Sequence, residues 1–121
     1  MQFIKDNTEN ARLITGIDSG AIRVDEDVIT SSFILNADTV VTWPVSHVNQ
    51  IESDHWQAVL DTQPEIILLG TGPTLIFPEP HQLKAAYDRQ IGVEVMDTEA
   101  ACRTYNLLVH ERRKVTAALI I

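Results

Sequence analysis

Short apolar stretches separated by turn residues occupy the first third of the chain. Between these stretches stand groups of Asp, Asn, Ser and Gly, the residues that favour tight turns. Pro44 closes the series, because proline cannot donate a backbone hydrogen bond to a neighbouring strand. The pattern predicts a meander of short antiparallel strands. Their ranges are 12–17, 21–24, 28–35 and 39–43.

Helical and extended patterns alternate in the remainder of the chain. Residues 65–69 are predicted to form a strand, and they are apolar after Glu65, as expected of a strand that is covered on both faces. Ser53 is a predicted N-cap for a helix that runs to about Thr62. Pro80 suits the first turn of a second helix, in which Leu83, Ala86 and Tyr87 form the apolar stripe. The last elements are predicted as a strand at 93–95, a helix at 97–110 and a strand at 115–121.

The order strand–helix–strand–helix–strand predicts an α/β unit in which helices pack on a mostly parallel sheet. No repeat, linker or low-complexity stretch divides the 121 residues. We therefore expect one domain over residues 1–121, long enough to bury a core without disulfide or metal crosslinks.

Charge and cysteine content narrow the function classes. The net charge of −8 argues against a nucleic-acid partner, which would need clustered Lys and Arg. Arg112, Arg113 and Lys114 form a basic cluster at a predicted helix end, where the helix dipole alone favours cations. The single Cys102 suits a reducing compartment. Without a visible targeting segment or membrane-spanning stretch, we expect a soluble cytoplasmic protein.

Two strand ends carry the residues that could form a ligand cleft. Gly70, Thr71 and Gly72 follow the apolar strand, and Met96, Asp97 and Thr98 follow the next strand. Adjacent strand ends are where α/β sheets bind ligands. However, the glycine turn is too short for a dinucleotide fingerprint and lacks the lysine of a phosphate-binding loop. Special backbone angles explain the glycines, and N-capping explains Asp97 and Thr98.

The helix after Asp97 adds three candidates to this cleft. Cys102 lies near the helix start, where a thiol can become nucleophilic, but none of the four histidines stands in a local relation to it. A buried, inert thiol is the favoured interpretation. Tyr105 shares the apolar stripe, so its hydroxyl needs a buried partner. Asn106 belongs to the polar side, which we expect to be solvated or to contact a partner protein. We predict no metal site and no cofactor.

These residues together resemble a known family. The segments at 70–72, 92–98 and 101–106, with Glu111 before 115–121, are similar to a family of small domains of unknown function that includes the mitochondrial NADH dehydrogenase (complex I) assembly factor 3. The resemblance implies a three-layer α/β (α+β) fold, with an N-terminal antiparallel β meander and a mixed sheet covered by helices. It supplies no residue roles. Arg112 stands where many relatives are expected to have glycine.

The resemblance and the candidate residues support two hypotheses. The first is a non-enzymatic interaction protein, assisting the assembly of a respiratory or other multisubunit complex through an unidentified protein partner. The alternative is a small-molecule-binding protein or enzyme that uses the cleft between 70–72 and 96–98. Unpaired edge strands in the meander also allow a homodimer.

Overall fold

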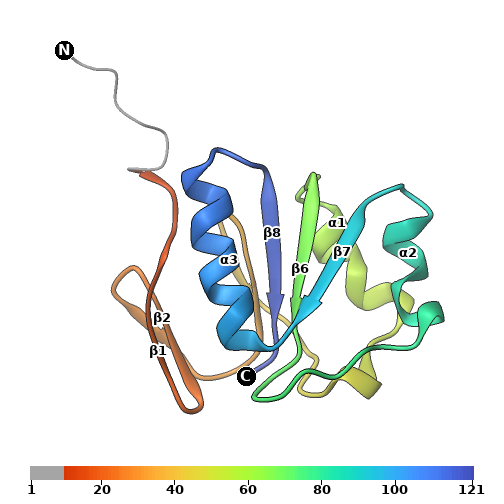
Figure 1. The fold of residues 1–121 in the computed structure, drawn as a ribbon, viewed down its shortest axis with the longest axis horizontal. Helices are drawn as coiled ribbons and strands as arrows, with labels where there is room; N and C mark the ends of the chain where they lie inside the picture. The colour runs from red at the N-terminus through yellow and green to blue at the C-terminus, as the bar shows by residue number, and fades with distance from the viewer. Residues whose placement is uncertain (1–9) are drawn as a thin grey trace.

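The computed structural model describes residues 10–121 and contains two β-sheets (Figure 1). The smaller is an antiparallel meander of order β1-β2-β3. The larger has the order β5-β4-β8-β6-β7 and is mixed, because β6 runs parallel to β7 and β8 whereas β4 runs antiparallel to β5 and β8. The strands are β1 Ile14–Asp18, β2 Ala21–Val24, β3 Asp27–Ile29, β4 Phe33–Leu35, β5 Val40–Thr42, β6 Ile66–Gly70, β7 Gly92–Met96 and β8 Val115–Leu119.

Helices cover both faces of the larger sheet. The long helix α3, Thr98–His110, packs on one face beside the three-stranded meander (Figure 1). The opposite face carries short 3-10 and α segments. These are η2 Val48–Gln50, η3 Ser53–Trp56, α1 Gln57–Leu60, η4 Pro80–Leu83 and α2 Lys84–Tyr87. The predicted mixed α and β architecture in three layers is confirmed.

Three local predictions are wrong. The stretch 28–35 is not one strand, because the polar residues 30–32 let the chain leave the small sheet after β3 and enter the large sheet at β4. Ser53 is not an N-cap, since the cap position belongs to Glu52, whose amide donates to His55 Nδ1 at 2.9 Å. Tyr87 does not join the apolar stripe of its helix and is 49% exposed.

Strand β6 contributes to a hydrophobic core on each side of the sheet. Ile67 and Leu69 pack among the short helices, whereas Leu68 packs against α3. All three side chains have no solvent exposure. Alternate residues of a strand point to opposite faces, so a continuous apolar run is what two covered faces require.

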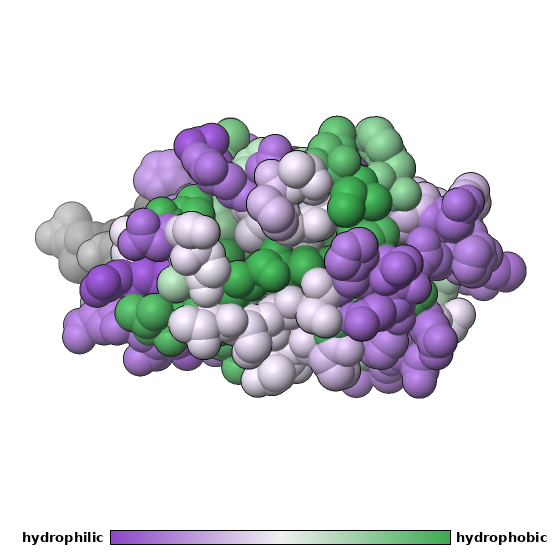
Figure 2. Space-filling model, turned by 90° about the horizontal axis from the view of Figure 1, so that it is seen from below, coloured by the Kyte–Doolittle hydropathy of each residue, from purple (hydrophilic) through white to green (hydrophobic). Residues whose placement is uncertain are grey.

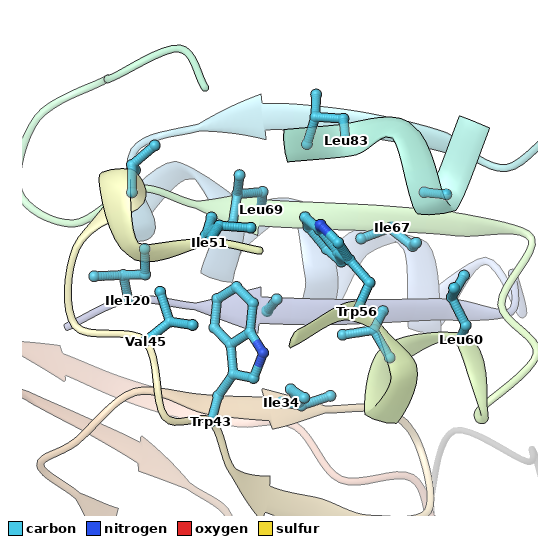
Figure 3. Close-up of a cluster of buried hydrophobic side chains, with 14 residues drawn as sticks. Ile34, Trp43, Val45, Ile51, Trp56, Leu60, Ile67, Leu69, Leu83 and Ile120 are labelled. Atoms are coloured by element: carbon cyan, nitrogen blue, oxygen red, sulfur yellow. The ribbon is translucent and has the colours of Figure 1, made fainter. Parts of the chain in front are cut away.

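Two tryptophans dominate the core beneath the short helices (Figure 3). The rings of Trp43 and Trp56 lie with their centroids 5.8 Å apart and tilted by 53°. Each indole also has a hydrogen-bond partner: Trp43 Nε1 donates to the carbonyl of His55 at 2.9 Å, and Trp56 Nε1 donates to that of Gln82 at 2.6 Å. The indoles therefore combine large apolar burial with satisfied polar atoms.

Gln82 ties together the segments above these tryptophans. Its amide nitrogen donates to the carbonyls of Val48 and Ile51 at 2.8 and 3.1 Å, and its amide oxygen accepts from the amide of Glu79 at 2.8 Å. The side chain is buried, so water cannot replace these bonds.

We predict that Gln82→Met lowers the free energy of unfolding by about 2–4 kcal/mol, because it leaves buried backbone groups without partners. Urea denaturation followed by tryptophan fluorescence measures the loss. Gln57→Met, at an exposed helix position, is the matched control and is expected to change stability by less than about 0.5 kcal/mol. Equal effects of the two substitutions would contradict this role of Gln82.

Candidate functional site

The two predicted strand ends do come together. Because β6 and β7 are parallel neighbours, Gly70 lies opposite Met96. The amide of Thr71 donates to the carbonyl of Met96 at 2.9 Å, and the amide of Thr98 donates to the carbonyl of Gly72 at 2.9 Å. The glycine turn and the start of α3 are thus joined by backbone hydrogen bonds.

The Thr98 side chain fills the space between these strand ends. Its hydroxyl accepts from the amide of Gly72 at 2.8 Å and donates to the carbonyl of Ile120. Thr71 and Thr98 are 3% and 7% exposed. The place where a ligand would enter is occupied by a satisfied hydroxyl group, which gives the junction a structural function.

Glycine is required at position 70 because atoms of Thr98 and Leu119 lie too close to leave room for a side chain. A Cβ atom added to it would lie 2.9 Å from Thr98 Oγ1 and 3.0 Å from both Thr98 Cα and Leu119 Cδ2. Gly72 is required for a different reason, since its φ of 101° lies in the region that disfavours residues with a side chain. The two glycines therefore serve the packing and the turn.

Asp97 has the capping role that its position predicted. Its carboxylate accepts from the amide of Ala100 at 2.9 Å and so satisfies one of the free amides at the start of α3. Met96 is half-buried and packs against the core beneath α3.

Cys102, Tyr105 and Asn106 lie farther along α3, on the side that faces the meander. Tyr105 is fully buried, and its hydroxyl donates to the carbonyl of Arg12 at 2.8 Å. Burial is the largest cause that raises the pKa of Tyr105, with Asp25 adding to it. The expected buried partner of this tyrosine is therefore present.

Asn106 corrects the expectation of a solvated polar face. Its amide oxygen accepts from the amide of Ile14 at 2.9 Å, and its amide nitrogen donates to the carbonyl of Ile14 at 2.7 Å. The Asn106 amide thus makes the two hydrogen bonds that a neighbouring strand would make at the unpaired edge of β1. Arg103, which pairs with Glu99, does lie on the exposed face.

Cys102 is one of the residues that line an open groove of about 360 Å³ between β1 and α3. Its side chain is 1% exposed, and burial raises its pKa to about 12, with the charge of Glu99 contributing. The thiol is therefore protonated at neutral pH and a poor nucleophile. Among residues 10–121 there is no group of three His, Cys, Asp or Glu side chains that could hold a metal ion.

An exposed apolar loop was not identified from the sequence. Leu75, Ile76 and Phe77 are 50%, 36% and 73% exposed, and they follow the carboxyl end of β6. Figure 2 views the molecule from this end and shows hydrophobic residues at its surface. The signal was three successive apolar residues between Pro73 and Pro78, two prolines that disfavour strand pairing and helix formation in this segment.

Thr71 fixes the start of this loop. Its hydroxyl donates to the carbonyl of Thr74 at 2.6 Å and accepts from the amide of Ile76 at 3.1 Å. Because Thr71 is also bonded to Met96, the loop is attached directly to the closed junction. The junction thus positions an apolar surface.

The fold and its filled junction define a small α+β domain in which the polar side chains of the expected cleft hold the elements together. A family model described as "Protein of unknown function (DUF498/DUF598)" matches residues 14–120. The chain belongs to this family. Within the described residues, no helix is long and apolar enough to cross a membrane.

Individual relatives agree with this assignment. NADH dehydrogenase (ubiquinone) 1 alpha subcomplex assembly factor 3 of Bos taurus is 40% identical over 84 residues, which cover 68% of this chain and 46% of that protein. The chain thus spans about half the length of this relative. The "13 kDa major membrane protein" of Francisella tularensis is 35% identical over 89 residues, 72% of each chain. A crystal structure from Bordetella parapertussis is 32% identical, with a TM-score of 0.86 over 91% of this chain and 95% of that one.

We predict that Gly70→Ala lowers the free energy of unfolding by about 1–3 kcal/mol, because the methyl group meets the backbone of Thr98 and cannot be accommodated by a side-chain rotation. Gly92→Ala is the matched control, since nothing lies within 4 Å of its added Cβ. Thermal unfolding of both variants measures the difference. A Gly70→Ala variant as stable as Gly92→Ala would show that the junction is open.

We predict that Cys102 in the folded protein resists alkylation by iodoacetamide at pH 8, where a pKa of about 12 leaves on the order of one thiol in ten thousand ionised. Mass spectrometry should show rapid labelling only after denaturation. A raised folded-state pKa also means that this thiol's contribution to stability is complete below its ordinary pKa of 9.0 and is lost as the pH rises toward 12. Labelling of the native chain at the rate of a free thiol would contradict this description.

Proposed function

We propose that this protein is a non-enzymatic interaction protein that assists the assembly of a multisubunit respiratory complex, and that its partner contacts the apolar loop Leu75–Ile76–Phe77. The exposure of three successive large apolar side chains on a positioned loop is the observation that carries the proposal. The name of the Bos taurus relative, an assembly factor for NADH dehydrogenase, supports that enzyme as the complex in question.

The physical properties of the loop suit a protein contact. Burying a side chain such as Leu75 or Phe77 against a partner stabilises the complex by about 1.5–3 kcal/mol. The hydrogen bonds of Thr71 already hold the loop, so less conformational entropy is lost on binding than with a free segment. Large exposed apolar groups that cluster in this way are typical of interaction surfaces.

The geometry favours this function over a small-molecule cleft at the strand ends. The hydroxyl of Thr98 occupies the space between the two turns, and Gly70 leaves no room for an added methyl group. Cys102 and Tyr105, the groups with reactive potential, are buried and protonated at neutral pH. A second copy of this chain is the other candidate partner for the apolar loop. The experiment below distinguishes self-association from contact with a different protein.

We predict that Leu75→Ser, Ile76→Ser and Phe77→Ser combined in one variant abolish function while leaving the fold intact, because these side chains face solvent. Cells that lack the gene would be complemented with wild type or variant, and assembled NADH dehydrogenase would be measured on native gels. We expect wild type to restore the assembled enzyme and the triple variant to fail at equal abundance.

The matched control is Val28→Ser combined with Leu107→Ser, which removes exposed apolar side chains elsewhere on the surface. It should complement fully. Light scattering of the purified proteins then tests self-association. If wild type is a dimer and the triple variant is a monomer, the loop is a contact between two copies of this chain. Full complementation by the triple variant would reject the proposed contact.

A further inference from the structure

Strand β7 is an edge of the larger sheet, because β6 is its one neighbour within residues 10–121 (Figure 1). The amide of Thr71 donates to the carbonyl of Met96, which shows that the backbone groups of Met96 face β6. Successive residues of a strand direct their backbone groups to opposite sides, so those of Val93 and Val95 face away from β6. No residue of the described chain forms a hydrogen bond with them. The outer side of β7 thus presents the amides and carbonyls of both valines without partners.

The side chains of β7 differ between its two faces. Val93 and Val95 are half-buried and pack against the core beneath the short helices. Glu94 points to the opposite face, like Met96, and is exposed. A strand added at this edge would therefore meet apolar groups on one face and a carboxylate on the other.

Glu94 disfavours a second copy of this chain as the added strand. An antiparallel pair of β7 strands satisfies both valines only in the register that sets Val93 of one copy opposite Val95 of the other. In that register the Glu94 side chains of the two copies stand directly opposite each other, with Cα atoms about 4.5 Å apart. Like charges in this position are destabilising, and charged residues are a common protection of edge strands. A shifted register leaves one valine of each copy outside the β7 pairing.

We propose that the edge of β7 binds an extended segment of a different protein as an antiparallel strand, with a lysine or arginine opposite Glu94 and an apolar residue on either side of it. Opposite residues of an antiparallel pair share a face, so the apolar residues would extend the core beside Val93 and Val95. The cation would pair with Glu94, and the net charge of −8 attracts a basic segment at longer range. Strand addition of this kind takes its affinity from main-chain hydrogen bonds and its specificity from alternate side chains.

The carboxyl end of this edge is joined to the apolar loop at 75–77. The hydroxyl of Thr71 fixes the loop, and the amide of Thr71 is bonded to Met96 at the end of β7. One partner protein can thus contact the loop and add a strand to β7. The proposal does not rest on the assembly role, because the unpaired backbone of β7 and the charge of Glu94 carry it.

A mixture of wild type with a Glu94→Lys variant tests the edge, because each protein alone sets like charges opposite each other and the mixture sets lysine opposite glutamate. Unlabelled variant is titrated into 15N-labelled wild type. We expect saturable shifts of the amides of Val93 and Val95, which added sodium chloride weakens. Unlabelled wild type, added in the same way, should leave these amides unchanged.

A capped peptide, Thr-Val-Lys-Val-Thr, tests the same edge without the bulk of a second copy. We expect it to shift the same amides and to bind wild type about fivefold more tightly than Thr-Val-Glu-Val-Thr does. Glu94→Lys should reverse this preference. Glu26→Lys is the matched control, since it makes the same charge change at an exposed turn position and should keep the wild-type preference.

Saturable shifts at Val93 and Val95 in the mixture, or with the lysine peptide and a preference that Glu94→Lys reverses, support the proposal. Absence of these shifts from both titrations overturns it. Equal binding of the two peptides would reject a basic partner strand and would also overturn it. Neither titration measures the assembly of a respiratory complex, so failure of this proposal is distinguishable from failure of the loop variant's complementation test.

Discussion

The burial of β6 and β8 on both faces is the constraint on which the rest of the structure depends. Leu68 and Leu119 point to one core, and Leu69 and Ala118 point to the other. A central pair of strands that is apolar on both sides leaves no face for water, so each neighbouring element must cover one of them. The meander and α3 cover one side, and the short helices with their two tryptophans cover the other (Figures 1 and 3).

This requirement explains why polar side chains in the interior have structural functions. Gln82, Asn106 and Thr98 each bond to backbone groups that the regular elements leave unpaired. Tyr105 does the same for the carbonyl of Arg12. Buried polar groups without partners would be costly, and these bonds remove that cost. The apolar loop at 75–77 is a surface that the core does not use, and it is left for recognition.

Much of the fold could be predicted from sequence because its signals are local. The strand at 65–69, the cap at Asp97 and the break between the strands predicted at 12–17 and 21–24 each report on neighbouring residues, and the elements formed where expected. The division of 28–35 between two sheets depended on pairing with β8, which is distant in sequence. No local pattern contains that information.

The candidate site shows the same limit. Sequence placed Gly70 and Thr98 near each other, because parallel strand ends meet, but it could not show that the Thr98 hydroxyl fills the gap between them. The role of Asn106 was missed because its partner, Ile14, lies 92 residues away.

The central claim is that the junction of the glycine turn with α3 is a closed structural joint. Amide hydrogen exchange, followed residue by residue by NMR, tests it most directly. The account predicts that the amides of Gly72 and Thr98 exchange as slowly as that of Leu69 in β6, and therefore only through global unfolding. Exchange of these two amides several orders of magnitude faster than that of Leu69 would show an opening joint and contradict the account.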